Sequence, residues 1–185
     1  GGGGRVGEGG AMGGARADAG PAGEVGAVAV ALDAEMRIAG PGGKRTVAAA
    51  DFFTDYFTTA LGDDEILTGI AFDSFAGWGA HYEKFNTVSQ AWSTVAVAAA
   101  VLATGGTVTA ARVALTNMGP TPVRARAVEA ALVGGPATAE AIRAAAAAAG
   151  EGTSPVDDAT APAEYRAHLA TVLTARALSA AVGGV

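Results

Sequence analysis

The protein has 185 residues, of which 48 are alanine and 28 are glycine, so fewer than half of its apolar residues are large enough to fill a core. It has no cysteine, which excludes disulfides, thiolate metal sites and iron–sulfur ligands of its own. The net charge of −6 and the pI near 4.8 are the opposite of the basic footprint that nucleic-acid-binding proteins carry.

The N-terminal quarter begins with a glycine-rich segment. Nine of the first 14 residues are glycine, and no periodicity is visible, so we expect residues 1–24 to be flexible. An apolar run over residues 27–34 leads into residues 35–38, where apolar and polar side chains alternate as in a half-buried strand. Residues 40–43 then predict a turn and residues 44–47 a second strand, which together make a hairpin.

Aromatic residues follow this hairpin. Asp51 is placed to cap a helix, and Phe52, Phe53, Tyr56 and Phe57 fall at spacings of one helix face. Such a cluster is more often part of a core than a cofactor site, and we predict a core role. A further strand is predicted over residues 66–72, and the turn residues at 74–79 suit a domain boundary.

The second half predicts strands followed by helices. Residues 82–85 and 92–102 have strand character, and Gly105 and Gly106 make a tight turn into a partner strand over residues 108–115. Three helices are expected after them. The first has Thr121 as N-cap, Pro122 at the first helical position and Gly134 just past its end. The second has Thr138 as N-cap, Glu140 in the first turn and Gly150 as terminator. The third begins within residues 160–164 and carries an apolar stripe of Tyr165, Leu169, Val172 and Leu173. Strands followed by helices indicate an α+β domain.

Signatures of self-contained catalysis are scarce. The chain has no dinucleotide-binding or P-loop pattern and no nucleophile elbow, and its two histidines, His81 and His168, lie far apart. The acidic trio at residues 63–65 suggests a cation site, but a solvated loop before a strand is the favoured interpretation. The residues alone therefore indicate a binding or assembly module, or part of a larger enzyme.

An ordered series of short segments nevertheless resembles one family. The segments are 30–35 (VALDAE), 44–53 (KRTVAAADFF), 64–68 (DEILT), 81–85 (HYEKF), 110–125 (AARVALTNMGPTPVRA), 148–155 (AAGEGTSP) and 165–177 (YRAHLATVLTARA). In this order and spacing they resemble the FAD-binding medium subunit of carbon monoxide dehydrogenase and xanthine dehydrogenase-type molybdenum hydroxylases. The similarity extends over most of the chain from residue 11 onward.

The resemblance implies a division of the chain. Residues 1–24 would be a glycine-rich remnant of a flavin motif, and residues 25–76 the end of the second FAD-binding subdomain. Residues 77–185 would be the C-terminal domain of the medium subunit, with a three-stranded antiparallel sheet and a three-helix bundle. The α+β pattern of the second half agrees with that domain.

The resemblance also implies a function. The family's medium subunit carries FAD and passes electrons between iron–sulfur clusters and an external acceptor. The clusters belong to a small partner subunit, and the molybdenum cofactor belongs to a large one. A protein of this kind would be an oxidoreductase only as part of its complex, and we expect it in the cytoplasm, since no signal peptide or membrane span is apparent.

Five residues correspond to cofactor-binding positions of the family. Met12, Gly13 and Gly14 match its second flavin motif, whose glycines let backbone amides approach the FAD diphosphate. Leu67 matches an apolar residue near the isoalloxazine, and Lys84 a basic residue near the flavin ring. Strand core for Leu67 and a solvated charge for Lys84 are the alternatives.

The match departs from the family in two places. The hydroxyl of the family's second motif is absent at Ala11, and in the next pattern, matched by residues 19–22, Gly20 replaces an aspartate. The family's first flavin motif has no counterpart in this sequence, so we expect the chain alone to bind FAD weakly or not at all. The alternative function is a non-catalytic assembly module that does not bind FAD by itself.

Overall fold

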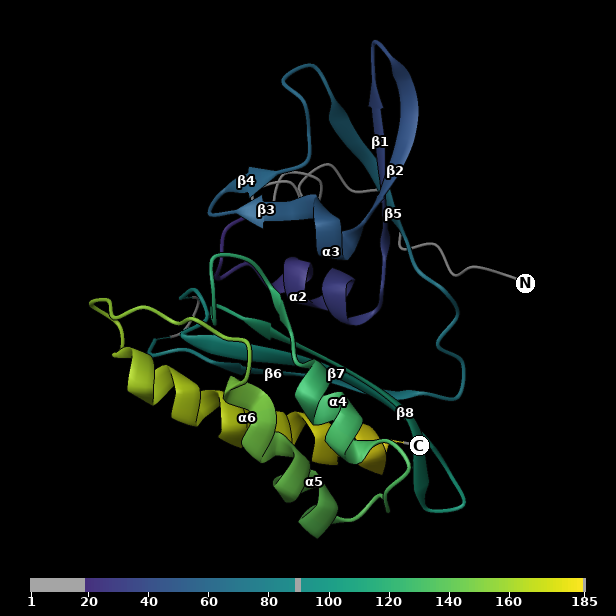
Figure 1. The fold of residues 1–185 in the computed structure, drawn as a ribbon, viewed down its shortest axis with the longest axis vertical. Helices are drawn as coiled ribbons and strands as arrows, with labels where there is room; N and C mark the ends of the chain where they lie inside the picture. Colours follow the sequence, from purple (N-terminus) through teal and green to yellow (C-terminus); the bar gives the residue numbers. More distant parts are fainter. Residues whose placement is uncertain (1–18, 89–90, 185) are drawn as a thin grey trace.

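The computed structural model describes residues 19–88 and 91–184. Figure 1 shows two parts joined by a long connection. The smaller part contains a three-stranded sheet and a short hairpin. The larger part is a four-stranded antiparallel sheet with the order β6-β7-β8-β9. The mixture of helices with antiparallel sheets confirms the predicted α+β class.

The three-stranded sheet has the order β2-β1-β5, built from β1 (Glu35–Gly40), β2 (Gly43–Ala48) and β5 (Ile66–Ala71). The predicted hairpin and the strand after it are therefore confirmed. Gly40 pairs with Gly43, and Gly43 has a φ of 111°, a conformation that favours glycine. Along β1, Met36 and Ile38 are buried while Glu35 and Arg37 are exposed, which is the alternation that the sequence showed.

The aromatic segment differs from its prediction. Only α3 (Ala49–Phe52) is helical, its N-cap is Ala48 rather than Asp51, and the chain continues into the hairpin of β3 (Phe53–Asp55) and β4 (Thr58–Thr59). Phe57, with a φ of 50°, lies in the tight turn between these strands. The two adjacent phenylalanines 52 and 53 are buried, whereas Tyr56 and Phe57 are exposed. The core prediction is thus right for the first pair and wrong for the second.

The larger sheet consists of β6 (Gly79–Phe85), β7 (Val95–Thr104), β8 (Thr107–Thr116) and β9 (Val123–Arg124). The first three confirm the predicted strands, with Gly105 and Gly106 at positive φ in the β7–β8 turn. The fourth corrects the helix predicted to start at Thr121, because Val123 and Arg124 pair with Leu115 and Ala114. The helix that follows, α4 (Arg126–Leu132), consequently begins later, with Ala125 as N-cap.

The remaining helices agree better with the sequence. Helix α5 (Ala139–Ala146) is capped by Thr138, whose hydroxyl accepts from the Ala141 amide, and it runs into the 3-10 helix η1 (Ala147–Gly150). Helix α6 (Ala163–Gly183) begins where expected and buries Leu169 and Leu173. Tyr165, predicted in the same stripe, is 43% exposed.

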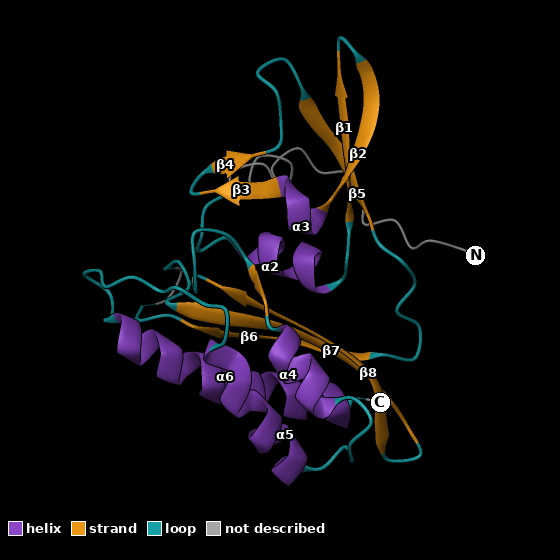
Figure 2. Cartoon of the chain, in the orientation of Figure 1, coloured by secondary structure: helices purple, strands orange, loops and turns teal. Residues whose placement is uncertain are grey.

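Helices cover both faces of the larger sheet (Figure 2). One face packs against α6 and the smaller helices through Val95, Val97, Val101 and their neighbours. On the other face lies α2 (Glu24–Ala31), which contacts β7, β8 and β9. The alanines at 98 and 114 belong to the α2 side, and their small size lets the helix approach closely. Helix α2 is therefore shared between the two parts of the molecule.

Candidate functional site

The five predicted cofactor-binding residues are distributed over different parts of the chain. Met12, Gly13 and Gly14 lie outside the described residues. Leu67 is a half-buried residue of β5, opposite Ile38, and packs against the core cluster around α2. Lys84 lies on β6 in the larger sheet, and its Nζ donates to Oε1 of Glu24 at 2.5 Å. The fit of all five to a flavin remains a prediction.

Glu24 lies in the first turn of α2, directly after a glycine-rich turn over residues 20–23. That turn is closed by a hydrogen bond from the Gly23 amide to the Gly20 carbonyl, 2.8 Å long. A Cβ at Gly23 would lie 2.9 Å from the same carbonyl oxygen, so only glycine fits there without a shift. The Lys84–Glu24 pair thus holds β6 against the start of α2, next to this turn.

The turn lines a pocket of about 330 Å³, which we call the Trp92 pocket. Its walls come from five separate segments: the turn itself, the β3–β4 turn, the entry to β7, the end of β8 and the start of α6. The residues that line it are Gly20, Pro21, Ala22, Gly23, Phe57, Trp92, Ser93, Asn117, Asp158, Thr160 and Arg166.

Hydrogen bonds fix these segments relative to one another. The Phe57 amide donates to the Ala19 carbonyl, and the Asn117 amide donates to the Pro21 carbonyl. Asn117 has a φ of 61°, and its side-chain amide donates to the Ser93 carbonyl at 2.9 Å. The pocket is therefore held by the backbone as well as by side chains, which favours a preformed shape.

One wall of the pocket is charged. The Arg166 side chain is only 2% exposed, and its guanidinium donates to the Thr94 carbonyl and to Oδ2 of Asp158. Oδ1 of Asp158 accepts from the Thr160 and Ala161 amides. The hydrogen bond from the Ala161 amide, with those from Thr160 and Arg166, lowers the pKa of Asp158. The pair is thus an arginine cation facing a stable carboxylate.

One buried polar atom of this wall, Nε of Arg166, has no hydrogen-bond partner among the described residues. The Ser93 hydroxyl lies near the Tyr82 phenol and interacts with it. Buried polar groups without partners are uncommon in proteins, and each requires an explanation. Because Nε of Arg166 is fully buried, Arg166 acts on the pocket through its charge rather than through a free donor.

Two aromatic residues also line the pocket. Phe57 is 68% exposed and Trp92 is 69% exposed, so both rings are free to contact a ligand. Flat apolar rings beside a few fixed polar groups are typical of sites for planar, partly polar cofactors. Neither Trp92 nor Arg166 carried a local sequence signal for this role. The pattern at residues 19–22 was the one predicted feature that pointed to the pocket.

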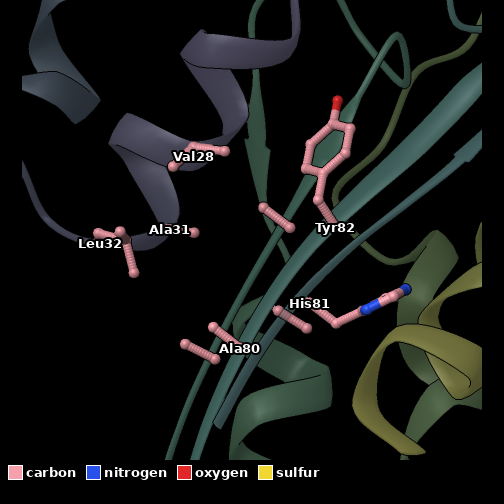
Figure 3. A pocket seen from close by; sticks show the side chains of 9 residues that line it. Val28, Ala31, Leu32, Ala80, His81 and Tyr82 are labelled. Carbon is pink, nitrogen blue, oxygen red and sulfur yellow. The ribbon is translucent and has the colours of Figure 1, made fainter. Parts of the chain in front are cut away.

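A second, smaller pocket of about 210 Å³ lies between α2 and the β6–β7 edge of the larger sheet (Figure 3). Small apolar side chains dominate its walls. Burial raises the pKa of Tyr82 to about 12, so its phenol stays protonated, 3.4 Å from Oγ1 of Thr116. His81 points away from Tyr82 in Figure 3 and pairs with Glu83. The groups here indicate a gap between small residues rather than a reactive site.

An ionic cluster ties the end of α2 to the larger sheet. The Arg124 guanidinium donates to the Val30 carbonyl, to Asp33 and to Glu129, and Arg112 also pairs with Asp33. The Glu129 carboxylate in turn accepts from the Val113 amide at 2.7 Å. Together with the Lys84–Glu24 pair, this cluster holds α2 at both of its ends.

The acidic trio forms no metal site. Asp63 and Asp64 are exposed, and Glu65 is bound by Arg45, whose guanidinium lies 2.6 Å from Oε2. That hydrogen bond, with one from the Gly62 amide, lowers the pKa of Glu65 to about 2. Within residues 19–88 and 91–184, no three side chains of the metal-binding types come together. In the same ranges no helix is both long and apolar enough to cross a membrane.

Comparison with known families gives two matches. Residues 1–72 match the FAD binding domain in molybdopterin dehydrogenase, and residues 80–181 match the CO dehydrogenase flavoprotein C-terminal domain. Among curated relatives, the carbon monoxide dehydrogenase medium chain of Hydrogenophaga pseudoflava is 36% identical over 84% of this chain and 54% of its own length. The carbon monoxide dehydrogenase medium chain of Afipia carboxidovorans is 34% identical over 93% of this chain and 60% of its own length. The chain thus spans little more than half of their length.

Solved structures agree with these matches. Carbon monoxide dehydrogenase from Hydrogenophaga pseudoflava, in a form lacking the Mo-pyranopterin moiety, superposes with a TM-score of 0.89 at 39% identity, covering 93% of this chain and 60% of that one. Quinoline 2-oxidoreductase from Pseudomonas putida gives a TM-score of 0.87 at 29% identity, covering 94% of this chain and 60% of that one. Both similarities extend across the two parts of the fold.

Proposed function

Because the chain belongs to the CO dehydrogenase flavoprotein family, we propose that it is the FAD-carrying portion of a medium subunit in a molybdenum hydroxylase. In this role it passes electrons between the iron–sulfur clusters of a small partner subunit and an external acceptor. A large partner subunit holds the molybdenum cofactor. A cytoplasmic location is part of the proposal, and cell fractionation tests it.

One observation carries the proposal beyond family membership. The Trp92 pocket is lined jointly by residues of both matched domains: the turn at 20–23 and Phe57 belong to the FAD-binding match, and Trp92, Asn117 and Arg166 to the C-terminal match. A site that exists only when the two domains meet is consistent with a ligand bound between them.

The residues of the pocket fit a flavin ring. Two exposed aromatic side chains offer apolar contact to a flat ring system, and the Arg166–Asp158 pair adds a fixed charged wall. The volume of about 330 Å³ is within the usual range for pockets that hold small cofactors. The turn over residues 20–23 lines the pocket with glycine at both of its ends, where no side chain hinders approach to the backbone.

When bound, FAD supplies one- and two-electron transfer, and the protein supplies position and electrostatics. Trp92 and Phe57 would cover the ring and exclude water. The Asn117 side chain, by holding the Ser93 carbonyl, would keep the entry to β7 in place at the pocket. The Lys84–Glu24 pair would keep the start of α2, and so the glycine turn, in place beside the pocket. We propose no side-chain acid–base step.

A titration with FAD tests this function. Flavin fluorescence is followed as FAD is added to the chain and to the chain assembled with its partner subunits. We expect binding that is tighter in the assembly, and an increase in Kd of about tenfold or more for Trp92→Leu, from loss of a stacking aromatic. Trp78→Leu, which changes the other tryptophan outside the pocket, is the matched control and should leave Kd within about twofold.

Two outcomes would count against the proposal. One is the absence of FAD binding by both the chain and the assembly. The other is an equal effect of the two tryptophan substitutions, which would place the flavin elsewhere.

A further inference from the structure

The charged wall of the Trp92 pocket is unusual among the ionic contacts of the described chain. Arg166 is the largest fully buried side chain, yet it lies at a pocket and keeps Nε without a hydrogen-bond partner. Arg124 also keeps one buried nitrogen, Nη2, without a described partner, so it is the place of Arg166 in the pocket lining that distinguishes it. The described residues that line the pocket include two charges, Arg166 and Asp158, and they are paired with each other.

The two charges differ in their surroundings. Asp158 is 45% exposed, and its Oδ1 accepts hydrogen bonds from two backbone amides, so solvent and these amides both stabilise its negative charge. Arg166 is almost fully buried. Its Nη2 donates to Asp158, and its Nη1 donates to the Thr94 carbonyl. The geometry therefore fixes a positive charge close to the pocket interior, and a negative charge that partly offsets it.

Resting on the proposed function, we infer that the Arg166–Asp158 pair sets the reduction potential of the bound flavin. Two electrons and one proton convert the oxidised ring into a reduced ring that has one negative charge at neutral pH. The electrons come from an iron–sulfur protein in the proposed complex, and the proton comes from solvent. Arg166 favours the added negative charge and Asp158 opposes it, so the pair stabilises the reduced ring to an intermediate degree.

This role predicts opposite effects for the two charges. Asp158→Asn removes the opposing charge but keeps a side-chain oxygen that can accept from the Thr160 and Ala161 amides, so the reduced ring should bind more tightly. Arg166→Met removes the favourable charge, so the reduced ring should bind more weakly. A purely structural role would instead make both substitutions weaken the two redox forms alike.

The test uses lumiflavin, which has the ring without phosphates, and the full chain under anaerobic conditions. Kd is measured for oxidised lumiflavin and for lumiflavin reduced with dithionite. We expect the ratio of oxidised to reduced Kd to rise about tenfold for Asp158→Asn, which corresponds to about +30 mV for a two-electron couple. For Arg166→Met it should fall by a similar factor, while Arg166→Lys, which keeps the charge, should stay within about threefold of the parent.

Matched controls separate a local effect from a change of net charge. Asp157→Asn alters the neighbouring carboxylate, which caps the Ala163 amide and does not line the pocket. Arg176→Met makes the same replacement on α6 at a side chain that is 65% exposed. Both should leave the Kd ratio unchanged. If Arg166→Met does not fold, Asp158→Asn and Arg166→Lys decide the question.

Each remaining outcome has one meaning. If Asp158→Asn lowers the ratio or leaves it constant, the inference is wrong although flavin still binds. If the parent binds FAD but not lumiflavin, the same Kd ratios are measured with FAD; a ratio that none of the substitutions changes places the ring outside this pocket, so that the inference fails while the proposed function survives. If neither the chain nor its assembly binds any flavin, both are wrong.

Discussion

Replacing Arg124 with methionine is expected to loosen the attachment of α2 to the larger sheet. Arg124 bridges the Val30 carbonyl at the end of α2, Asp33 just beyond it and Glu129 on α4. The substitution keeps much of the side-chain length but removes every donor. It leaves Glu129, whose side chain is 10% exposed, with only the Val113 amide as its described partner.

The size of the effect follows from burial. Removing one partner of a buried ion pair costs about 3–5 kcal/mol, because the remaining charge is left uncompensated. The contact with Asp33 adds little, since that carboxylate is 53% exposed and solvent-exposed pairs contribute at most about 1 kcal/mol. We expect the free energy of unfolding to fall by about 3 kcal/mol. With a urea m-value of roughly 2–3 kcal/mol/M, the midpoint should drop by about 1 M.

Urea denaturation followed by circular dichroism measures this change. Arg126→Met, an exposed arginine two residues away, is the matched control and should stay within about 0.5 kcal/mol of the parent. The double substitution Arg124→Met with Glu129→Met should recover most of the loss, because no buried charge is left behind. Equal midpoints for Arg124→Met and Arg126→Met would refute the reasoning.

Three further predictions concern other sites. Thr138→Ala should destabilise the protein by about 1 kcal/mol in the same urea assay, because the α5 N-cap is lost, while Thr138→Ser should be nearly neutral; equal losses would argue against a capping role. The pKa of Glu65 is lowered in the folded chain, so the Glu65 carboxylate stabilises the fold above its ordinary pKa of 4.5, and this stabilisation is lost as the pH falls towards about 2. Urea denaturation at a series of pH values should therefore show a smaller decrease in the free energy of unfolding over this range for Arg45→Met than for the parent. Lys84→Met and Glu24→Gln should weaken FAD binding by similar factors, measured by fluorescence titration, because Lys84 acts through Glu24; a loss confined to Lys84→Met would indicate direct contact with the flavin.

Features that depend on neighbouring residues could be predicted from the sequence. The β1–β2 hairpin follows from glycine turn residues between alternating strands, and the cap at Thr138 from a hydroxyl before an alanine-rich helix. The alanine abundance reflects packing as well as composition, because alanines on β7 and β8 form the surface on which α2 lies.

Features that depend on distant residues could not be predicted this way. Val123 and Arg124 form a strand because β8 offers them a free edge, although Thr121 and Pro122 locally favour the start of a helix. Helix α2 has apolar residues on all sides, since both parts of the molecule cover it, and so it shows no helical periodicity in the sequence. Asp51 is not a cap because α3 already begins at Ala49, and the helix is short because the chain enters a hairpin at Phe53.

The candidate site shows the same limit. The resemblance supplied the pattern at residues 19–22 and the basic residue Lys84, which the structure places beside the turn through Glu24. Trp92 and Arg166 lie about 70 and 144 residues, respectively, after the turn at residues 19–22. Their meeting depends on how α6 and the entry to β7 pack together, and no local spacing encodes it.

The flavin content of the assembled protein tests the central proposal most directly. The complex is isolated from its native host through a tag on this chain, and FAD is extracted with acid and counted against the protein. We expect about one FAD per chain, in a complex that also contains an iron–sulfur protein. A folded chain that assembles with its partners and contains no flavin would contradict the proposal.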